Sequence, residues 1–262
     1  MRKVTKIWLI IATSLVLVGC IIFAGVMTLY KWDFRKLSTV RYETNNYEIN
    51  EDYKNISVVT RTADVVLIPC ESLKSSVVCY EQENLKHSVE VKDGTLVISV
   101  VDTRKWYEHI GISFGTSKIT VYIPRGEYGT LSVKTSTGNI YAENVTADAL
   151  GLCVSTGDIS VSNVDCKNVT SSGNTGDISL KNVIATEKIS INRSTGDIKL
   201  DRCDATEISV KTDTGKVVGS LLSEKVFIAE TSTGKVSVPK TTTGGKCEIT
   251  TSTGDIKIEV TH

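Results

Sequence analysis

The sequence has no excess of charge of either sign. It carries 30 basic and 30 acidic side chains, and residues 31–262 have a net charge of −3, because Arg2, Lys3 and Lys6 are the charged residues among the first 30. Such a balance gives no electrostatic basis for binding nucleic acid. Proline is scarce, with three residues, and the apolar content of 40% is ordinary, so the chain is neither collagen-like nor disordered.

Signatures of catalysis and of cofactor binding are scarce as well. No phosphate-binding loop occurs, and His87, His109 and His262 do not have the spacing of metal ligands. An enzyme would need paired carboxylates, or a nucleophile and its base, in a cleft. The short, uniform repeats described below have no long loops to build one. We therefore predict that the protein is not an enzyme, that it has no catalytic, cofactor-binding or metal-ligating residues, and that it needs no cofactor.

A single long apolar run lies near the N-terminus. Residues Ile7 to Tyr30 contain no charged side chain over 24 positions, more than the roughly 20 needed to cross a bilayer. We interpret this run as a transmembrane helix. Two alternatives remain: a signal peptide cleaved near Ala24 and Gly25, and a lipoprotein signal at Leu17–Cys20, although Ile21–Phe23 continues the apolar run.

The charges flanking this run nearly balance, so they indicate its orientation only weakly. A six-residue tail (1–6) is easily retained in the cytoplasm, and a large C-terminal domain is translocated largely regardless of its charge. We expect a single-pass protein of the cell membrane whose C-terminal domain is extracytoplasmic. Tyr30 and Trp32 fit the aromatic belt at the outer interface.

The dominant feature of the sequence is an internal repeat. A Thr-Gly dipeptide recurs every 19 or 20 residues, with its glycines at Gly138, Gly157, Gly176, Gly196, Gly215, Gly234 and Gly254. Two positions after each glycine stands a β-branched residue: Ile140, Ile159, Ile178, Ile198, Val217, Val236 and Ile256. A unit this short must stack on its neighbours to bury an apolar face. Residues 131–262 therefore predict an all-β fold, a parallel β-solenoid (β-helix) with seven coils of about 19 residues.

The corners and ends of this solenoid can also be predicted. The Thr-Gly pair marks one corner, and Asn144, Asn163 and Asn182 mark a second, since asparagine tolerates left-handed geometry. We expect the last coil, Thr253–His262, to form an open end. Residues 53–130 are expected to form irregular first coils, with Thr62–Val65 in the place of Thr-Gly-Asp-Ile and strands at 77–80, 89–91, 96–101 and 119–123. Residues 31–52 are polar and aperiodic, a linker or N-terminal cap.

At this point the chain resembles a family of bacterial membrane-anchored proteins described as putative adhesins with β-strand repeats, a domain of unknown function. The resemblance rests on the Ser-Thr-Gly-Asp-Ile repeats, on the strand Ile119–Pro124 and on the N-terminal span. It implies adhesion at the cell surface, and some relatives are associated with cell-envelope stress. The shape also resembles that of bactofilins, β-helices that polymerise end to end.

Two candidate chemistries accompany the repeat. Asp158, Asp177 and Asp197 follow successive glycines and could hold a hard cation, although a turn residue is the simpler interpretation. Cys70 and Cys79 flank an expected hairpin turn and could form a disulfide. Four other cysteines lie outside the span. From their columns in the repeat, we expect Cys166, Cys203 and Cys247 to be small core residues and Cys153 to be exposed.

The segment from Asp102 to Gly115 interrupts the pattern and concentrates four aromatic or imidazole side chains, Trp106, Tyr107, His109 and Phe114. We favour a plug of the solenoid end over a loop that contacts a sugar, a peptide or the membrane.

We therefore predict a non-catalytic extracytoplasmic binding or adhesion module of the cell envelope, with a role in envelope-stress sensing, which presents a flat face rich in serine and threonine. Its partners would be the membrane, through the N-terminal helix, and an envelope component or protein. The alternative is a structural β-helix that self-associates through its solenoid ends and polymerises at the membrane.

Overall fold

The computed structural model describes residues 3–38, 40–106 and 115–261, and the chain divides into two compact units. The first unit comprises residues up to 42 together with 104–115. It contains helix α1 (Lys3–Leu29) and the short 3-10 helix η1 (Phe34–Leu37). Residues Val4–Leu29 have a mean hydropathy of 2.7, and α1 is long and apolar enough to cross a membrane.

The second unit, residues 43–103 with 116–262, is all-β. The strands expected at 77–80, 89–91, 96–101 and 119–123 are confirmed and are longer than expected. Its strands are β1 (Tyr42–Ile49), β2 (Asn55–Val59), β3 (Ala63–Cys70), β4 (Ser75–Gln82), β5 (Leu85–Lys92), β6 (Thr95–Asp102), β7 (Ser117–Pro124), β8 (Glu127–Thr137), β9 (Ile140–Thr156), β10 (Ile159–Thr175), β11 (Ile178–Thr195), β12 (Ile198–Thr214), β13 (Val217–Leu221), β14 (Lys225–Thr233), β15 (Val236–Ser237), β16 (Gly245–Thr253) and β17 (Ile256–Val260).

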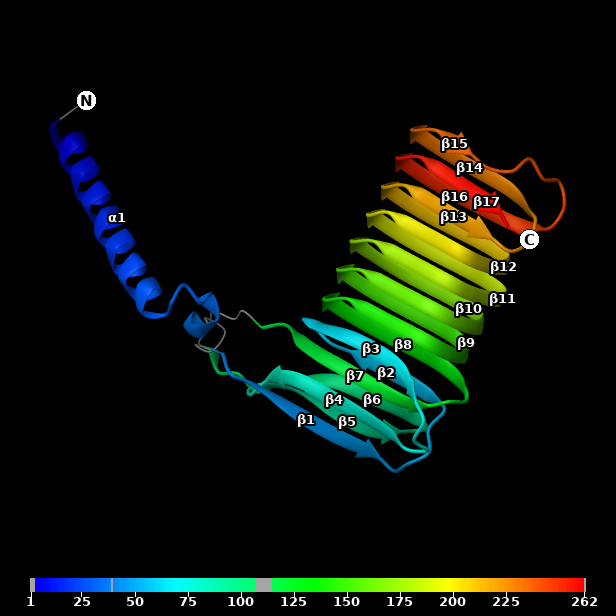
Figure 1. Cartoon of the computed structure of the whole chain (residues 1–262), viewed down its shortest axis with the longest axis horizontal. Coiled ribbons are helices and arrows are strands. Elements are labelled where there is room, and N and C mark those ends of the chain that lie inside the picture. The colour runs from blue at the N-terminus through cyan, green and yellow to red at the C-terminus, as the bar shows by residue number, and fades with distance from the viewer. Residues whose placement is uncertain (1–2, 39, 107–114, 262) are drawn as a thin grey trace. The chain divides into compact units, whose positions relative to one another are not determined.

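The repeats stack in parallel with like residues on like, as the sequence predicts. Strand β10 pairs with β9 and β11 so that Ile159 lies beside both Ile140 and Ile178. These isoleucines are at most 1% exposed and belong to one continuous apolar core. Along each strand buried and exposed residues alternate, because successive side chains point to opposite faces. The unit is therefore a β-solenoid-like repeat of stacked strands (Figure 1). Its interior is filled mainly with aliphatic side chains.

Two kinds of residue bend the backbone at the corners. The seven Thr-Gly glycines have φ between 122° and 156°, and a Cβ at Gly157 would overlap the carbonyl oxygen of Gly138 in the neighbouring repeat. Asn144, Asn163 and Asn182 have φ between 51° and 54°, the left-handed region. Both predicted corners are confirmed.

The order of the last strands in space differs from their order in the sequence. Strand β16 pairs with β12 on one side and with β14 on the other, while β17 lies between β13 and β15 (Figure 1). The amide of Gly215 accordingly donates to the carbonyl of Thr253, at 2.9 Å, and the amide of Gly254 to that of Thr233, at 2.9 Å. The expectation that Thr253–His262 forms the open end is therefore wrong. The end is formed by β14 and β15, because every repeat offers the same register to its neighbours.

The N-terminal end is also assembled out of sequence. Strand β2 lies between β6 and β8, and β3 lies between β7 and β9. The Asp64 carboxylate accepts from the amide of Asn139 at 2.7 Å, so Thr62–Val65 does stand where later repeats have Thr-Gly-Asp-Ile. Beyond β6 and β7 lie β5 and β4, which pair antiparallel to them, and β1 pairs with β4.

Residues 31–52 were expected to be aperiodic, but part of this segment forms an alternating strand. Strand β1 alternates, with Asn45, Tyr47 and Ile49 less exposed than their neighbours Thr44, Asn46 and Glu48. Tyr47 and Ile49 pack against the apolar core. The polar composition of this segment concealed a strand that covers one end of the core.

Candidate functional site

One face of the repeat is flat and carries small hydroxyl side chains. The outward residues at the centre of strands β8 to β12 lie in register and are Ser132, Gly151, Thr170, Ser190 and Ser209. Each of them is exposed or half-buried. Because none is larger than threonine, this column, called the hydroxyl face below, has no projecting side chain along its midline.

A groove borders this face at the next corner. Its volume is about 440 Å³, and it is lined by both charged and small residues: Lys54, Glu127, Tyr128, Thr146, Ala147, Asp148, Asp165, Cys166, Lys167 and Thr186. The ammonium of Lys167 lies 2.7 Å from the carboxylate of Asp148, and this hydrogen bond lowers the pKa of Asp148 and raises that of Lys167. We call it the corner groove.

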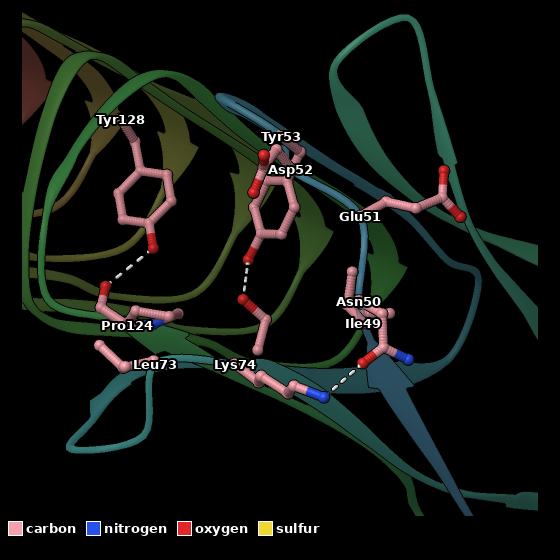
Figure 2. Close-up of a pocket in the computed structure, with 10 residues that line it drawn as sticks. Ile49, Asn50, Glu51, Asp52, Tyr53, Leu73, Lys74, Pro124 and Tyr128 are labelled. Carbon is pink, nitrogen blue, oxygen red and sulfur yellow. Dashed lines mark hydrogen bonds between the residues drawn. The ribbon is translucent and has the colours of Figure 1, made fainter.

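A second recess lies where the loops of the N-terminal strands meet. Its volume is about 240 Å³, and it is lined by Ile49, Asn50, Glu51, Asp52, Tyr53, Leu73, Lys74, Ser75, Pro124 and Tyr128. Figure 2 shows that the side chains of Tyr53 and Tyr128 run side by side, with their hydroxyl groups pointing the same way. Their ring centroids are 6.2 Å apart and the ring planes meet at 26°. We call it the tyrosine recess.

Both tyrosines are held in place through their hydroxyl groups. The hydroxyl of Tyr53 lies 2.5 Å from Oγ of Ser75, and the hydroxyl of Tyr128 donates to the carbonyl of Pro124 at 2.8 Å (Figure 2). Burial is the main cause that raises the pKa of both tyrosines. Both hydroxyls therefore stay protonated at neutral pH, and the rings form a rigid, uncharged wall.

Tyr128 lines both recesses. Of the consecutive residues Tyr53 and Lys54, Tyr53 lines the tyrosine recess and Lys54 lines the corner groove. Each recess carries charges of both signs. Glu51, Asp52 and Lys74 line the tyrosine recess, where Lys74 donates to the side chain of Asn50 at 2.7 Å. Aromatic carbon beside hydrogen-bonding groups suits a polar ligand with an apolar side, such as a sugar or a peptide.

The aspartates that follow the glycines accept hydrogen bonds from backbone amides of the next repeat. Oδ1 of Asp158 accepts from the amide of Asp177 at 2.7 Å, and Oδ1 of Asp177 accepts from the amide of Asp197 at 2.8 Å. The carbonyl oxygen of the Asn139 side chain accepts in the same way from Asp158, at 2.8 Å. Asparagine replaces aspartate here without loss of the bond, which favours the turn interpretation over the cation site.

The disulfide that the sequence allowed between Cys70 and Cys79 is not formed. Cys70 and Cys79 are both free, and the thiol of Cys70 faces the carbonyls of Ser72 and Lys74, at 3.6 and 3.8 Å. The prediction that Cys166, Cys203 and Cys247 are core residues is confirmed, since they are at most 7% exposed. Cys153 is half-buried rather than exposed.

The aromatic segment can be followed only in part. Trp106 is 79% exposed, while Tyr107, His109 and Phe114 lie outside the described residues, as does the choice between plug and contact loop. The sequence Gly111–Gly115 also has the Gly-x-Ser-x-Gly spacing of a hydrolase nucleophile elbow, which precedes a helix. Its residues 111–114 lie outside the described residues, and the element that follows is strand β7 (Ser117–Pro124).

The structure brings together one group that the sequence did not predict. Cys79 and Glu81 on β4 and His87 on β5 are buried, and their ligand atoms lie within 4.8 Å of one another. The signal was available, because Cys79 and Glu81 occupy alternate, inward positions of one strand and His87 an inward position of the next. Glu81 and His87 are polar residues at inward positions that are otherwise mainly apolar, and this exception indicates the site.

Comparison with known proteins places the second unit in a family. Residues 53–262 match the family model described as Toastrack DUF4097. No curated protein matches the sequence.

Several solved structures are loosely similar. A putative adhesin from Bacteroides fragilis is 13% identical and matches with a TM-score of 0.45 over 84% of this chain and 97% of that chain. A putative cell adhesion protein from Clostridium sporogenes is 14% identical, with a TM-score of 0.40 over 85% and 100%. A putative lipid binding protein from Parabacteroides distasonis is 17% identical, with a TM-score of 0.26 over 84% and 97%. Because the family model covers most of the chain, the protein belongs to the Toastrack DUF4097 family.

Proposed function

We propose that the protein is a non-catalytic, extracytoplasmic binding or adhesion module of the cell envelope. In this proposal α1 anchors the chain in the membrane, with the C-terminal domain outside. The repeat, taken as seven coils of about 19 residues, presents the hydroxyl face to the ligand. The observation that carries the proposal is that two recesses share Tyr128 and that the larger one borders the flat hydroxyl face.

The chemistry of this surface suits a polar, extended ligand. The hydroxyl groups of Ser132, Thr170, Ser190 and Ser209 are spaced by neighbouring strands, about 4.8 Å apart per strand. A polymer with regularly spaced hydroxyl or amide groups could hydrogen-bond to them along its length. The Tyr128 ring at the end of the groove would then contact the apolar side of one unit. We infer a glycan or an extended peptide of the envelope as the ligand class.

The corner groove offers the variant for a binding test. Asp148 and Lys167 form an exposed ion pair, so Asp148→Ala with Lys167→Ala removes two groove contacts with little effect on stability. Lys257 and Glu259 form an equally exposed pair at 2.9 Å outside both recesses and serve as the matched control. The full chain in detergent micelles would be sedimented with isolated cell-wall polymer.

We expect the groove variant to lose binding by about tenfold or more, as when a few central contacts carry an interface, and the control pair to bind like the wild type. Equal sedimentation of both variants with the wild type would refute the groove as the site. A protease added to intact cells tests the location. Cleavage of the repeat from outside supports an extracytoplasmic module, which a role in envelope-stress sensing requires, and protection until lysis contradicts both.

The second candidate function is self-association through the solenoid end. It is favoured by β14, which within the described residues pairs on one side only, with β16. Val226 and Ile228 on this strand and Val236 on β15 are 38%, 45% and 45% exposed. An unpaired strand edge with apolar side chains can add a strand from another chain. Because β1 and the antiparallel β4 and β5 cover the other end, this contact would give an end-to-end dimer more readily than a filament.

Sedimentation of the full chain in detergent distinguishes this candidate from the first. A concentration-dependent dimer that Ile228→Lys abolishes would support association through β14. A monomer at every concentration would exclude it, and would leave the binding proposal unaffected.

A further inference from the structure

A buried polar cluster lies in the N-terminal part of the β unit. The carboxylate of Glu81 is fully buried, and the side chain of His87 is 3% exposed. Cys79 is fully buried beside them, two residues before Glu81 on the same strand. Burying a carboxylate is unfavourable unless it is paired or coordinates a metal, and these three residue types together are the ligands that zinc prefers.

The side chains of His87 and Glu81 each have a second polar atom, and both of these atoms already have hydrogen-bond partners. Nε2 of His87 lies 2.9 Å from Oγ1 of Thr60, which leaves Nδ1 to face Oε2 of Glu81 at 2.6 Å. Oε1 of Glu81 accepts from the side-chain amide of Asn45 at 2.8 Å. The backbone amide of His87 also donates to Oε2 of Glu81, at 2.7 Å. Outer partners of this kind orient the ligands of metal sites.

We propose that Cys79 Sγ, Glu81 Oε2 and His87 Nδ1 bind a single divalent transition metal ion, with zinc as the natural occupant. The three donor atoms lie within 4.8 Å of one another. Tetrahedral zinc with bond lengths of about 2.0 to 2.3 Å separates its ligand atoms by about 3.3 to 3.7 Å. Nδ1 and Oε2, which are 2.6 Å apart, would therefore separate by less than about 1 Å, and Sγ of Cys79, within 4.8 Å of both, would approach them by no more than about 1.5 Å.

Binding exchanges the metal for a proton. The thiol of Cys79 loses its proton and binds as the thiolate. Nδ1 of His87 binds the metal through its lone pair, which requires the ring proton to lie on Nε2, from where it is donated to Oγ1 of Thr60. The fourth position falls to water or to the side chain of Asn45, which already contacts Glu81.

Such an ion would fasten the N-terminal strands to each other. Its ligands come from β4 and β5, and their outer partners come from β1 and from Thr60, which lies between β2 and β3. These strands are the ones assembled out of sequence at the end of the core. The proposed role is thus structural, and it does not depend on the envelope ligand.

Cobalt is a suitable probe, because a thiolate bound to Co²⁺ gives a charge-transfer absorption that oxygen and nitrogen ligands do not. The full chain in detergent would be reduced, freed of metal with a chelator and titrated with Co²⁺. We expect one equivalent to bind with this absorption and to be displaced by Zn²⁺, and we expect Zn²⁺ to raise the melting temperature. Cys79→Ala should abolish the absorption, whereas Cys247→Ala, at an equally buried cysteine, should keep it.

A variant that retains the ligands guards against misfolding. Thr60→Val preserves side-chain size and all three donors but removes the partner of Nε2, so affinity should fall by about 10- to 100-fold. The proposal is overturned if the wild type shows no thiolate absorption with Co²⁺, or if Cys79→Ala shows the same absorption as the wild type. Either result would leave Glu81 and His87 as a buried hydrogen-bonded pair without a metal.

Discussion

Arg193 fills the space that a side chain on Gly173 would need. The two residues are register partners on β11 and β10, and a Cβ added to Gly173 would overlap Nη1 of Arg193 and the carbonyl oxygen of Val154. The guanidinium is buried, and it donates to the carbonyls of Gly176 at 2.7 Å, of Gly157 at 2.5 Å and of Val154 at 3.1 Å.

The same column explains why an arginine is buried there. Val154 occupies this inward position in the repeat beside Gly173, whereas Thr135, Thr212, Thr251 and Thr231 occupy it in four others. The hydroxyls of Thr251 and Thr231 donate to the corner carbonyls of Gly215 and Gly254, at 3.1 and 3.0 Å. Glycine at position 173 has no donor, and Arg193 reaches across to the carbonyl of Gly157 in its place. Burial lowers the pKa of Arg193, while Asp158 and Asp177 act in the opposite direction.

Gly173→Ala should therefore destabilise the protein by about 1 to 3 kcal/mol, since it forces Arg193 from its site. Gly151→Ala is the matched control, because a Cβ there meets no atom closer than 3.9 Å. Urea unfolding of both variants measures the difference. Equal unfolding midpoints would show that Arg193 does not depend on the glycine.

Ser171→Val should stabilise the protein. Among the described side chains, Oγ of Ser171 is the one buried polar atom without a hydrogen-bond partner. Its register partners are Leu152 and Ile191, both buried. Valine places one methyl group where the unpaired hydroxyl was and adds a second, and loss of the unpaired hydroxyl removes a penalty of about 1 to 2 kcal/mol. A lower melting temperature for the valine variant would contradict the assignment of this column to the core.

The spatial order of the last strands can be tested with two truncations. Ile256 is fully buried between Val217 and Val236, whereas Val236 is 45% exposed at the end of the stack. Ile256→Ala should cost about 2 to 5 kcal/mol of unfolding free energy, and Val236→Ala less than about 1 kcal/mol. If the repeats stacked in sequence order, Ile256 would be the exposed residue and the ranking would reverse.

Stability should fall at alkaline pH because of the buried thiols. Burial raises the pKa of Cys166 and of Cys247 to about 12 and that of Cys203 to about 11, from 9.0. A folded-state pKa above the unfolded value means that the contribution is fully present below pH 9 and is lost between pH 9 and the folded pKa, by about 1.4 kcal/mol per pH unit and thiol.

Cys166→Ala should remove the contribution of one thiol, about 1.4 kcal/mol per pH unit, from the pH dependence of the unfolding free energy. Alanine is suited to the position, because Ala147 and Ala185 are the register partners of Cys166. The free energy of unfolding would be measured at several values between pH 8 and pH 11, with Cys70→Ala, at a half-buried cysteine, as the control. A slope unchanged in Cys166→Ala would show that this thiol ionises as easily in the folded state as in the unfolded chain.

The candidate site follows from the sequence only in part. The hydroxyl face could be predicted, since residues such as Thr170 and Ser190 occupy an outward column of the repeat. The tyrosine recess could not, because Tyr53 and Tyr128 are 75 positions apart and neither lies in the regular repeat. The Cys79, Glu81 and His87 cluster does not follow from the sequence, because its ligands do not have a helix or loop spacing and meet only when two strands pair.

The sequence alone determined the local structure: the period of the Thr-Gly pair set the length of a repeat, alternation set which side chains enter the core, and glycine and asparagine set the two corners. It could not determine which repeat lies beside which. Gly254 fits equally well against Gly215 or Gly234, because every repeat presents the same hydrogen-bonding edge and the same apolar column. Only the tertiary structure decided that β16 lies between β12 and β14 and that β17 lies between β13 and β15. It likewise decided that β2 lies between β6 and β8 and that β3 lies between β7 and β9.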